Sequence, residues 1–181
     1  MTFRIATADD AAAIMFVRIS AAHALTRRYG QGPWSTETTE RGVLNGMRHS
    51  RIVLYYDGDT PIGTFRLTSH RPWAIDRAFF TPVVRPLYLT DMAVHPDMQR
   101  RGIGRASLAH AEAMTRAYPA DAIWLDAYDA EAGASDFYAT CGYRECGRTS
   151  FRDSKLVYFE KAIASFVRVA ANVLPPIAPS P

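Results

Sequence analysis

The sequence predicts a mixed α/β domain, with a central sheet of about seven strands flanked by helices. Short β-rich runs alternate with longer segments of helical periodicity. The strand predicted over residues 87–94 leads through a Gly-containing basic turn into a helix over 102–118, and a second strand and helix follow about 20 residues later. At 181 residues, the chain has the size of one domain with a single core.

The first predicted elements are a short strand over residues 3–6 and the helix that follows it. Thr7 and Asp10 have the spacing of a capping box, which opens a helix. The helix is expected to end near Gly30, since Gly30 and the residues after it break the pattern. Its apolar positions at helical spacing are Ile14, Val17, Ala21 and Leu25.

A second helix and a hairpin are predicted next. Ser35 is the expected N-cap of a helix that runs to about Arg48, with Glu37 favourably placed in its first turn. The β-rich runs 52–56 and 62–68 flank an Asp-Gly-Asp turn, which is typical of a hairpin. Because apolar and polar residues alternate in the second run, one face of the hairpin is expected to meet water.

The segment from Ser69 to Pro86 is irregular and apolar. It contains three prolines together with Trp73, Phe79 and Phe80. This composition predicts either a loop packed on its own domain or a wall of a substrate pocket.

The C-terminal half is expected to complete the sheet. A strand is predicted over 122–128 and a short helix over 133–141. Gly142 follows, at the position where a helix end favours a left-handed residue. The last two strands are expected over 143–151 and 155–162.

Residues 1–162 are predicted as one catalytic domain, and residues 163–181 as a C-terminal helix with a Pro-rich tail. Apolar residues of the tail follow helical spacing until Pro175 and Pro176. Such a helix packs either on its own sheet or against a second copy of the chain. Monomer and homodimer therefore both stay open.

Charge and cysteine content limit the class of protein. The formal net charge is +3, and the basic residues are scattered except at Arg100, Arg101 and Arg105, which suits a polyanionic small ligand and argues against a nucleic-acid surface. Cys141 and Cys146 are most simply reduced thiols of a cytoplasmic protein, with no metal site. No signal peptide is recognised, and no apolar run has the ~18 residues of a membrane span.

The basic turn has the chemistry of a phosphate site. Its glycines allow the backbone to approach a ligand, and the helix that follows offers free N–H groups and a partial positive charge. It lacks the Lys-Ser/Thr of a Walker A loop and the third glycine of a dinucleotide fingerprint, where Ser107 stands. It therefore predicts a pyrophosphate cradle, with a structural turn as the alternative. The cradle residues are Gln99, Arg100, Arg101, Gly102, Ile103, Gly104 and Arg105.

Two segments together resemble the GNAT N-acetyltransferases. Residues 99–104, after a strand that ends in Ala-Val, resemble the acetyl-CoA motif Q-x-x-G-x-G of that family. Residues 134–143, in the pattern A-x-x-x-Y-x-x-x-G-Y, resemble its second motif. Their order and spacing agree with the family, and the similarity in element order spans roughly residues 3–161.

The resemblance implies a GNAT-like acyl-CoA N-acyltransferase fold and a role for each matched residue. The backbone of Met92, Ala93 and Val94 would pair with the pantetheine arm of acetyl-CoA, and an amide there would polarise the thioester carbonyl. Amides from Arg100 to Arg105 would hold the pyrophosphate. Tyr138 would contact the cofactor near its sulfur and act as general acid, with a buried core tyrosine as the alternative.

The general base is not assigned by the resemblance. Many members of the family carry Asn at the position where this chain has Glu131. Many also carry a glutamate on the substrate-facing side of the strand before the first motif, where this chain has Tyr88 and Thr90. Asp91 is the nearest carboxylate and the candidate catalytic base, although strict alternation points it to the opposite face. The alternatives are a water chain, Asp126, Asp129 and Glu131.

These observations predict an enzyme that transfers an acetyl group from acetyl-CoA to a primary amine by direct attack in a ternary complex. A small amine is favoured, while an amino acid, a drug and a protein amine stay open. One alternative is a non-catalytic acyl-CoA binding or sensing module, because the strand glutamate is missing. Another is a nicotinamide dinucleotide enzyme, supported by Asp126 about 24 residues after Gly102. The aromatic residues that favour an acceptor with an apolar part are Trp34, Trp73, Phe79 and Phe80.

Overall fold

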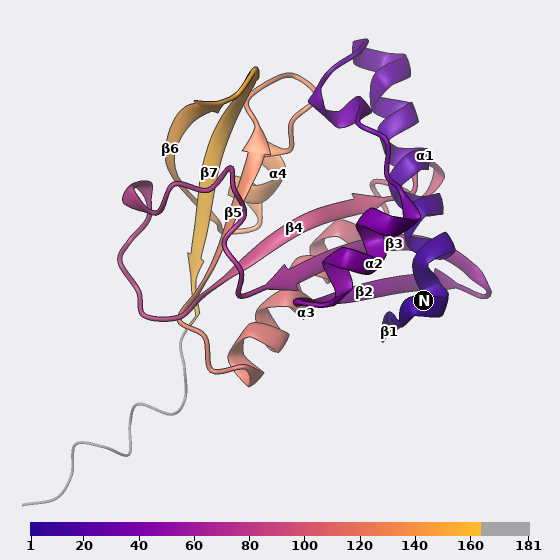
Figure 1. Cartoon of the computed structure of the whole chain (residues 1–181), viewed down its shortest axis with the longest axis horizontal. Coiled ribbons are helices and arrows are strands. Elements are labelled where there is room, and N and C mark those ends of the chain that lie inside the picture. Colours follow the sequence, from indigo (N-terminus) through magenta and orange to yellow (C-terminus); the bar gives the residue numbers. More distant parts are fainter. Residues whose placement is uncertain (164–181) are drawn as a thin grey trace, which may run out of the picture.

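The computed structural model describes residues 1–163 and contains a seven-stranded mixed sheet with helices on both faces (Figure 1). The strand order is β1-β2-β3-β4-β5-β7-β6, and β4 and β5 form the parallel pair among otherwise antiparallel neighbours of these residues. The predicted fold class is confirmed. The strands are β1 (Thr2–Ile5), β2 (Ser50–Asp57), β3 (Thr60–Thr68), β4 (Pro86–Val94), β5 (Ala122–Tyr128), β6 (Arg144–Phe151) and β7 (Ser154–Ala162).

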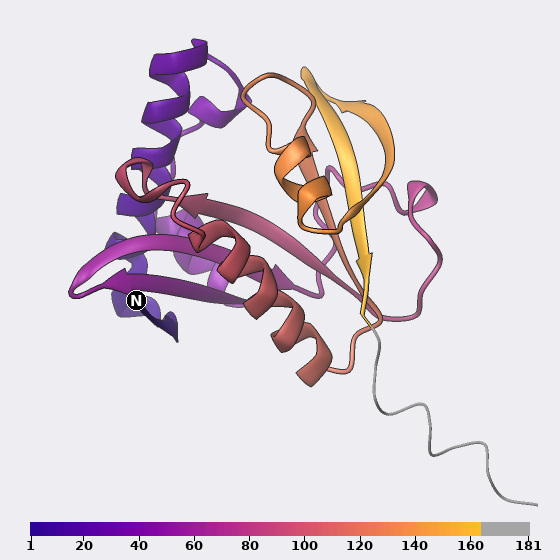
Figure 2. The same cartoon turned by 180° about the vertical axis from the view of Figure 1, so that it is seen from behind.

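Two helices cover each face of the sheet. On one face lie α1 (Ala11–Tyr29) and α2 (Glu40–Met47), and α1 packs on β3 and β4. On the other face lie α3 (Ile103–Ala117) and α4 (Ser135–Thr140), which Figure 2 shows from behind. β4 thus lies in the centre of the sheet, with α1 on one side of it and α3 on the other.

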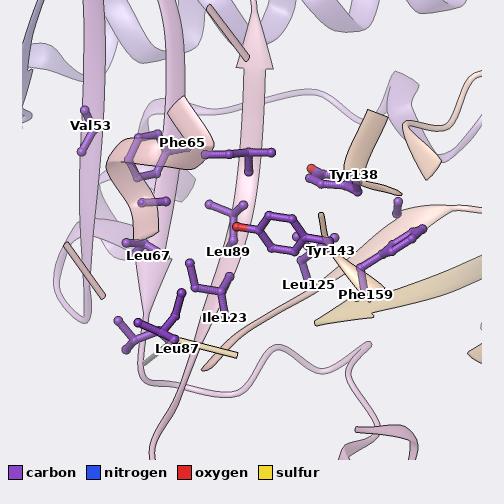
Figure 3. Close-up of a cluster of buried hydrophobic side chains, with 14 of the residues drawn as sticks. Val53, Phe65, Leu67, Leu87, Leu89, Ile123, Leu125, Tyr138, Tyr143 and Phe159 are labelled. Atoms are coloured by element: carbon purple, nitrogen blue, oxygen red, sulfur yellow. The ribbon is translucent and has the colours of Figure 1, made fainter. Parts of the chain in front are cut away.

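The larger core fills the space between the sheet and helices α3 and α4 (Figure 3). Alternate residues of the strands face the opposite side, because side chains of a strand have a period of two. There Leu54 packs beneath α1 and α2, and Trp124 packs beneath the segment that precedes β4. Members of the larger core shown in Figure 3 include Val53, Phe65, Leu89, Leu125, Tyr138, Tyr143 and Phe159.

The start and end of α1 agree with the prediction. The Asp10 carboxylate accepts a hydrogen bond from the Thr7 backbone N–H at 2.8 Å, which closes the entry to the helix. Gly30 follows the last helical residue with φ of 80°, a left-handed value that glycine adopts without strain. The hairpin between β2 and β3 is also present, with Gly58 in its turn at φ of 58°.

The predicted start of the second helix is wrong. Thr39, and not Ser35, is the N-cap of α2, because its Oγ1 accepts from the Gly42 N–H at 3.2 Å. Ser35 Oγ lies 2.7 Å from Thr26 Oγ1 and ties the connection back to α1. Residues 36–39 therefore precede the helix, and Glu37 lies outside its first turn.

The expectation of a wet face on the hairpin is also wrong. Thr64 and Thr68 of β3 are buried, and Arg66 between them is half-buried. The cause is the packing of α1 on β3, which covers the face that alternation alone leaves open. The polar side chains of this face are therefore interior groups.

The segment between β3 and β4 is a loop packed on its own domain, as one of the two alternatives predicted. The ring of Phe80 stacks on Trp124 with centroids 4.5 Å apart. The Thr81 N–H and Oγ1–H donate to the Glu160 carboxylate at 2.8 and 2.7 Å. Trp73, in contrast, is 92% exposed.

The chain ends its described part at Ile163, which is buried and whose N–H donates to the Asp121 carbonyl at 2.8 Å. The rest of the predicted C-terminal helix and tail, residues 164–181, lies outside the described residues. Within residues 1–163, no helix combines the length and apolar character needed to cross a bilayer.

Candidate active site

The central feature of the site is the divergence of β4 and β5. The two strands pair in parallel over three positions, from Pro86 with Ala122 to Tyr88 with Trp124, and then separate (Figure 1). Beyond Tyr88, no strand of residues 1–163 pairs with the β5-facing edge of β4. Apart from the Val94 carbonyl, which accepts a hydrogen bond from Gln99, the N–H and C=O groups of that edge are therefore open to an extended ligand, as to an added strand.

A β-bulge lies at the same place in β4. Arg66 of β3 pairs with Thr90, whereas Thr64 pairs with Ala93, so two residues of β4 oppose one of β3. Asp91 within the bulge has φ of 53°, a left-handed value that is uncommon for residues other than glycine. The extra residue breaks the alternation on which the predicted direction of Asp91 depended.

A cavity of about 510 Å³ opens between the diverging strands. Its floor is formed by Leu89–Ala93 of β4 and Asp126–Tyr128 of β5. Its other walls come from α1, from residues 33–38, and from the start of α4. A space of this size, lined by apolar groups and a few charged ones, is typical of a small-molecule site.

Tyr138 of α4 lies at this cavity and is 8% exposed. Its hydroxyl donates to Met92 Sδ at 3.9 Å, and Figure 3 shows its ring next to Tyr143 in the core. Burial is the main cause that raises the pKa of the Tyr138 phenol, and the charge of Asp126 raises it further. The side chain is therefore a neutral hydroxyl that can donate a proton within the site, while its ring is also part of the core.

Asp91 points into the cavity on the α1 side of the sheet, the same side as Thr90. Its carboxylate is held by Arg18 Nη2 and by Arg66 Nε, each at 2.9 Å. Arg66 Nε also donates to Thr90 Oγ1 at 2.8 Å. The expectation that Asp91 faces away from Thr90 is wrong, because the bulge reverses its direction.

Tyr88 has the predicted direction but does not reach the cavity. It lies on the same face as Thr90, where Phe80 and Trp124 of the neighbouring cluster cover it. Its ring meets Trp124 at 5.9 Å between centroids. Tyr88 is therefore a core residue, and the substrate-facing position of β4 belongs to Thr90.

Asp126 lines the cavity from β5 and differs from Asp91 in its surroundings. Within residues 1–163, no Lys, Arg or His lies within ion-pair distance of its carboxylate. Burial, and to a smaller extent the charge of Asp91, raises the pKa of Asp126 above its usual range. A carboxylate whose charged form is disfavoured in this way is a stronger proton acceptor once ionised.

The other two carboxylates considered as bases are placed differently. Asp129 Oδ1 accepts from Arg148 Nη1 at 2.6 Å, so its charge is already compensated. Glu131 is exposed and does not line the cavity. Of the three alternatives, Asp126 has both the position and the environment of a base.

The basic turn leads into the N-terminus of α3, as predicted. Gly102 is the N-cap with φ of 83°, and Arg100 has φ of 59°. The first N–H groups of α3 lack intrahelical partners, as at any helix start. Arg100, Arg101 and Arg105 are exposed and form no ion pair within residues 1–163. This combination fits a pyrophosphate.

Three other cradle residues have structural contacts of their own. Gln99 Nε2 donates to the Val94 carbonyl at 3.2 Å and ties the turn to the end of β4. The Ile103 side chain is buried in the larger core, so its backbone amide is the part that can meet a ligand. A Cβ on Gly104 would lie 3.0 Å from Phe137 Cζ, so the absence of a side chain there serves the packing of α3 against α4.

Several cavity residues were not found from the sequence. Arg18 belongs to α1, Arg66 to β3 and Tyr128 to the end of β5. For Arg18 the sequence contains one signal that could have placed it near the core face of the helix. Arg18 and Leu25 are seven residues apart, and residues at this spacing share a helix face. Of the four aromatic residues expected near the acceptor, Trp34 lines the cavity, and its ring meets Tyr128 at 5.8 Å. Trp73, Phe79 and Phe80 do not line it.

Comparisons with known proteins agree with this architecture. Residues 19–143 match the Acetyltransferase (GNAT) family. No curated protein matches the sequence. Similar solved structures include the ribosomal-protein-S18-alanine N-acetyltransferase from Escherichia coli, at 17% identity and a TM-score of 0.69, covering 96% of this chain and 98% of that chain.

Two further structures show the same fold. The PaiA N-acetyltransferase from Thermoplasma acidophilum, solved with coenzyme A, has 13% identity and a TM-score of 0.67, over 87% of this chain and 98% of that one. The aminoglycoside 6'-acetyltransferase type Ii has 15% identity and a TM-score of 0.66, over 91% of this chain and 98% of that one. At such identities the likeness concerns the fold.

The family match extends over more than half of the chain and includes both motifs, the basic turn and the segment around Tyr138. The structure adds the diverging strands β4 and β5, the bulge of β4 against β3, and the seven-stranded sheet. The resemblance predicted from the motifs is confirmed, and the chain belongs to the GNAT family of acetyltransferases.

Proposed function

We propose that this chain transfers the acetyl group of acetyl-CoA to the primary amine of a small molecule, by direct attack in a ternary complex. The observation that carries the proposal is the cavity between β4 and β5, where the neutral Tyr138 hydroxyl and the unpaired Asp126 carboxylate line one space. The cytoplasmic location predicted from the sequence is part of this proposal.

The chain's residues fit acetyl-CoA as the donor. The exposed arginines and the free N–H groups at the start of α3 suit the pyrophosphate, and Gly102 leaves open space beside its Cα. The unpaired edge of β4 over Met92–Val94 suits the amide groups of the pantetheine arm. Acetyl-CoA would supply an acetyl group that is already activated as a thioester.

In this proposal Asp126 takes the role of base from Asp91. The two arginines that hold Asp91 occupy both of its oxygens, whereas Asp126 has no such partner within residues 1–163. Asp126 accepts the proton of the acceptor ammonium, and the free amine can then form the C–N bond as the C–S bond breaks.

The remaining roles follow from the surroundings of the cavity. The Tyr138 hydroxyl, which its buried position keeps protonated until that moment, donates its proton to the departing sulfur. The phenolate that remains takes up the second proton that the nitrogen loses as the amide forms, so Tyr138 returns to its neutral state. Backbone N–H groups on the open edge of β4 would stabilise the charge that develops on the acetyl oxygen. Positioning and polarisation of the carbonyl therefore provide most of the expected rate enhancement.

Release of free CoA from acetyl-CoA, measured with a panel of primary amines, tests this function. The expected result is CoA release that depends on the amine, together with an equal amount of acetylated amine by mass spectrometry. A rise in melting temperature with acetyl-CoA and no CoA release with any amine would favour the sensing module. Stabilisation by NAD but not by CoA would favour the dinucleotide enzyme.

A further inference from the structure

We infer that the acceptor is an amine that also carries an anionic group, namely a carboxylate as in an amino acid. Arg18 binds this carboxylate, and the amine of the same molecule lies at Asp126. The inference rests on the proposed function and names the substrate class of the same site. It is drawn from the distribution of charge over the two walls of the cavity.

One wall of the cavity carries an excess of positive charge. Asp91 is a single carboxylate between two guanidinium groups, Arg18 and Arg66, and each of these three side chains is about one quarter exposed. Within this cluster one positive charge is therefore not compensated. The other carboxylates that line the cavity are Asp126 and the exposed Glu37. A partly exposed cation of this kind attracts an anionic ligand group.

Arg18 lines the cavity and keeps free donors. It uses Nη2 for Asp91, and its Nε and Nη1 have no other protein partner within residues 1–163. Arg66 also lines the cavity, and its Nη groups have no hydrogen-bond partner within residues 1–163. Its Nε, however, donates to Thr90 Oγ1 and pairs with Asp91, and its Nη1 lies close to Gly46 of α2, where an added Cβ would be 2.6 Å away. Arg18 therefore retains N–H groups that can donate to a ligand carboxylate.

The opposite wall carries unpaired negative charge. Asp126 lines the same cavity without a cationic partner. Tyr128 is close enough to both walls for their charges to affect its pKa. Burial is the largest cause that raises this pKa, the charges of Asp126 and Asp91 raise it further, and the charge of Arg18 lowers it. An ammonium group at Asp126 and a carboxylate at Arg18 would thus neutralise both ends of one cavity.

The wall between these two ends is apolar and aromatic. Leu25 of α1 and Trp34 line the cavity, and the Trp34 ring meets Tyr128 edge to face. This surface fits the apolar side chain of an amino acid such as phenylalanine or leucine. A simple alkylamine would fill this surface but leave the free donors of Arg18 without a partner.

The test compares amines that share a skeleton and differ in the anionic group. Phenylalanine, its amide, phenethylamine and the aminophosphonate analogue of phenylalanine are each supplied with acetyl-CoA, and kcat/KM is measured from CoA release. We expect phenylalanine to exceed its amide and phenethylamine by about tenfold or more. A preference for the aminophosphonate would instead identify a phosphate-type group as the anion that Arg18 binds.

Variants of Arg18 separate this contact from general damage to the site. In Arg18→Met the preference for the acid is expected to fall to about one, while Arg18→Lys retains part of it because the charge stays. Arg27→Met, on the exposed face of the same helix, is the matched control and is expected to keep the full preference. Because the preference is a ratio within each variant, differences in folding cancel. Differences in amine basicity cancel when this ratio is compared between the parent and the variant.

Two results would overturn the inference while the transferase function stands. One is equal kcat/KM for phenylalanine and phenethylamine in a protein that releases CoA with both. The other is a preference for the acid that Arg18→Met leaves unchanged. Failure of every amine to release CoA would overturn the proposed function and this inference together.

Discussion

The Tyr138 hydroxyl donates its hydrogen bond to Met92 Sδ, at 3.9 Å, and so links α4 to the bulge of β4. A thioether sulfur is a weak acceptor, which makes this hydroxyl poorly satisfied for a buried group. A departing thiolate would be a much better acceptor at the same place. The contact therefore holds the phenol near the point where β4 and β5 diverge, and it leaves the hydroxyl able to donate its proton to a stronger acceptor.

Tyr138→Phe is expected to lower kcat by about 10²-fold, because general acid catalysis is worth about 10² to 10⁴. Affinity for acetyl-CoA, measured by calorimetry, is expected to stay within about twofold, since the ring and its packing remain. Unchanged kcat in Tyr138→Phe would remove the phenol from the mechanism.

Tyr143→Phe is the matched control for this change. Tyr143 packs against Tyr138 in the same cluster, but its buried hydroxyl has no hydrogen-bond partner within residues 1–163 and does not line the cavity. Removing an unsatisfied hydroxyl is expected to raise the free energy of unfolding by about 1 kcal/mol and to leave kcat unchanged. A fall in kcat comparable to that of Tyr138→Phe would show that packing, and not proton donation, explains both.

Asp126→Asn is expected to lower kcat and at the same time raise stability. Burial raises the pKa of Asp126 above its ordinary value of 3.8, so the folded protein binds this proton more tightly than the unfolded chain does. Stability is then lost as pH rises from about 4 through the raised pKa. The variant avoids that loss, and its gain in melting temperature should grow over this interval and stay constant above it.

Melting curves of the two proteins between pH 4 and pH 8 measure this gain directly. Asp129→Asn is the control, because Asp129 is paired with Arg148 and its replacement removes a favourable contact. A variant of Asp126 with full activity, or one that is less stable than the parent at neutral pH, would contradict the assignment of Asp126 as base.

Asp91→Asn is expected to act in the opposite sense on stability. The change leaves Arg18 and Arg66 without their shared counter-charge, and the partly exposed site should lose about 1–2 kcal/mol of unfolding free energy, as urea denaturation would show. Asparagine tolerates the left-handed backbone of this position, so the loss reports on charge and not on strain. Loss of activity at unchanged stability would instead return Asp91 to the role of base.

The bulge explains which part of the site could be predicted from the sequence. The motifs placed the basic turn at the start of α3 and Tyr138 on a helix after β5, as the structure has them, because they are local patterns with fixed spacing. The direction of Asp91 could not be predicted, since one extra residue in a strand reverses every side chain after it, and no Gly or Pro marks the position. Arg18 was missed because it lies 73 residues from its partner Asp91 and meets it through the packing of α1.

Helix starts show a similar limit. Both Ser35 and Thr39 are good N-cap residues, and the local pattern could not choose between them. The choice depends on a tertiary contact, the bond of Ser35 to Thr26 of α1. As a result residues 36–38, which were expected within the helix, line the cavity.

Gly104 offers a test of whether a motif glycine serves the ligand or the fold. A Cβ there would lie 3.0 and 3.3 Å from ring atoms of Phe137, so Gly104→Val should overpack the contact between α3 and α4 and lower the unfolding free energy by about 1–3 kcal/mol. Phe137→Ala opens a cavity at the same place and is destabilising by itself.

In the double variant the valine can fill the space that the ring leaves. The two changes should then cost less together than the sum of the single effects, a coupling that urea denaturation of the four proteins measures. Affinity for CoA, weakened in Gly104→Val through displaced α4, should recover with the packing. Restored stability without restored affinity would show instead that the glycine is needed where the backbone approaches the pyrophosphate.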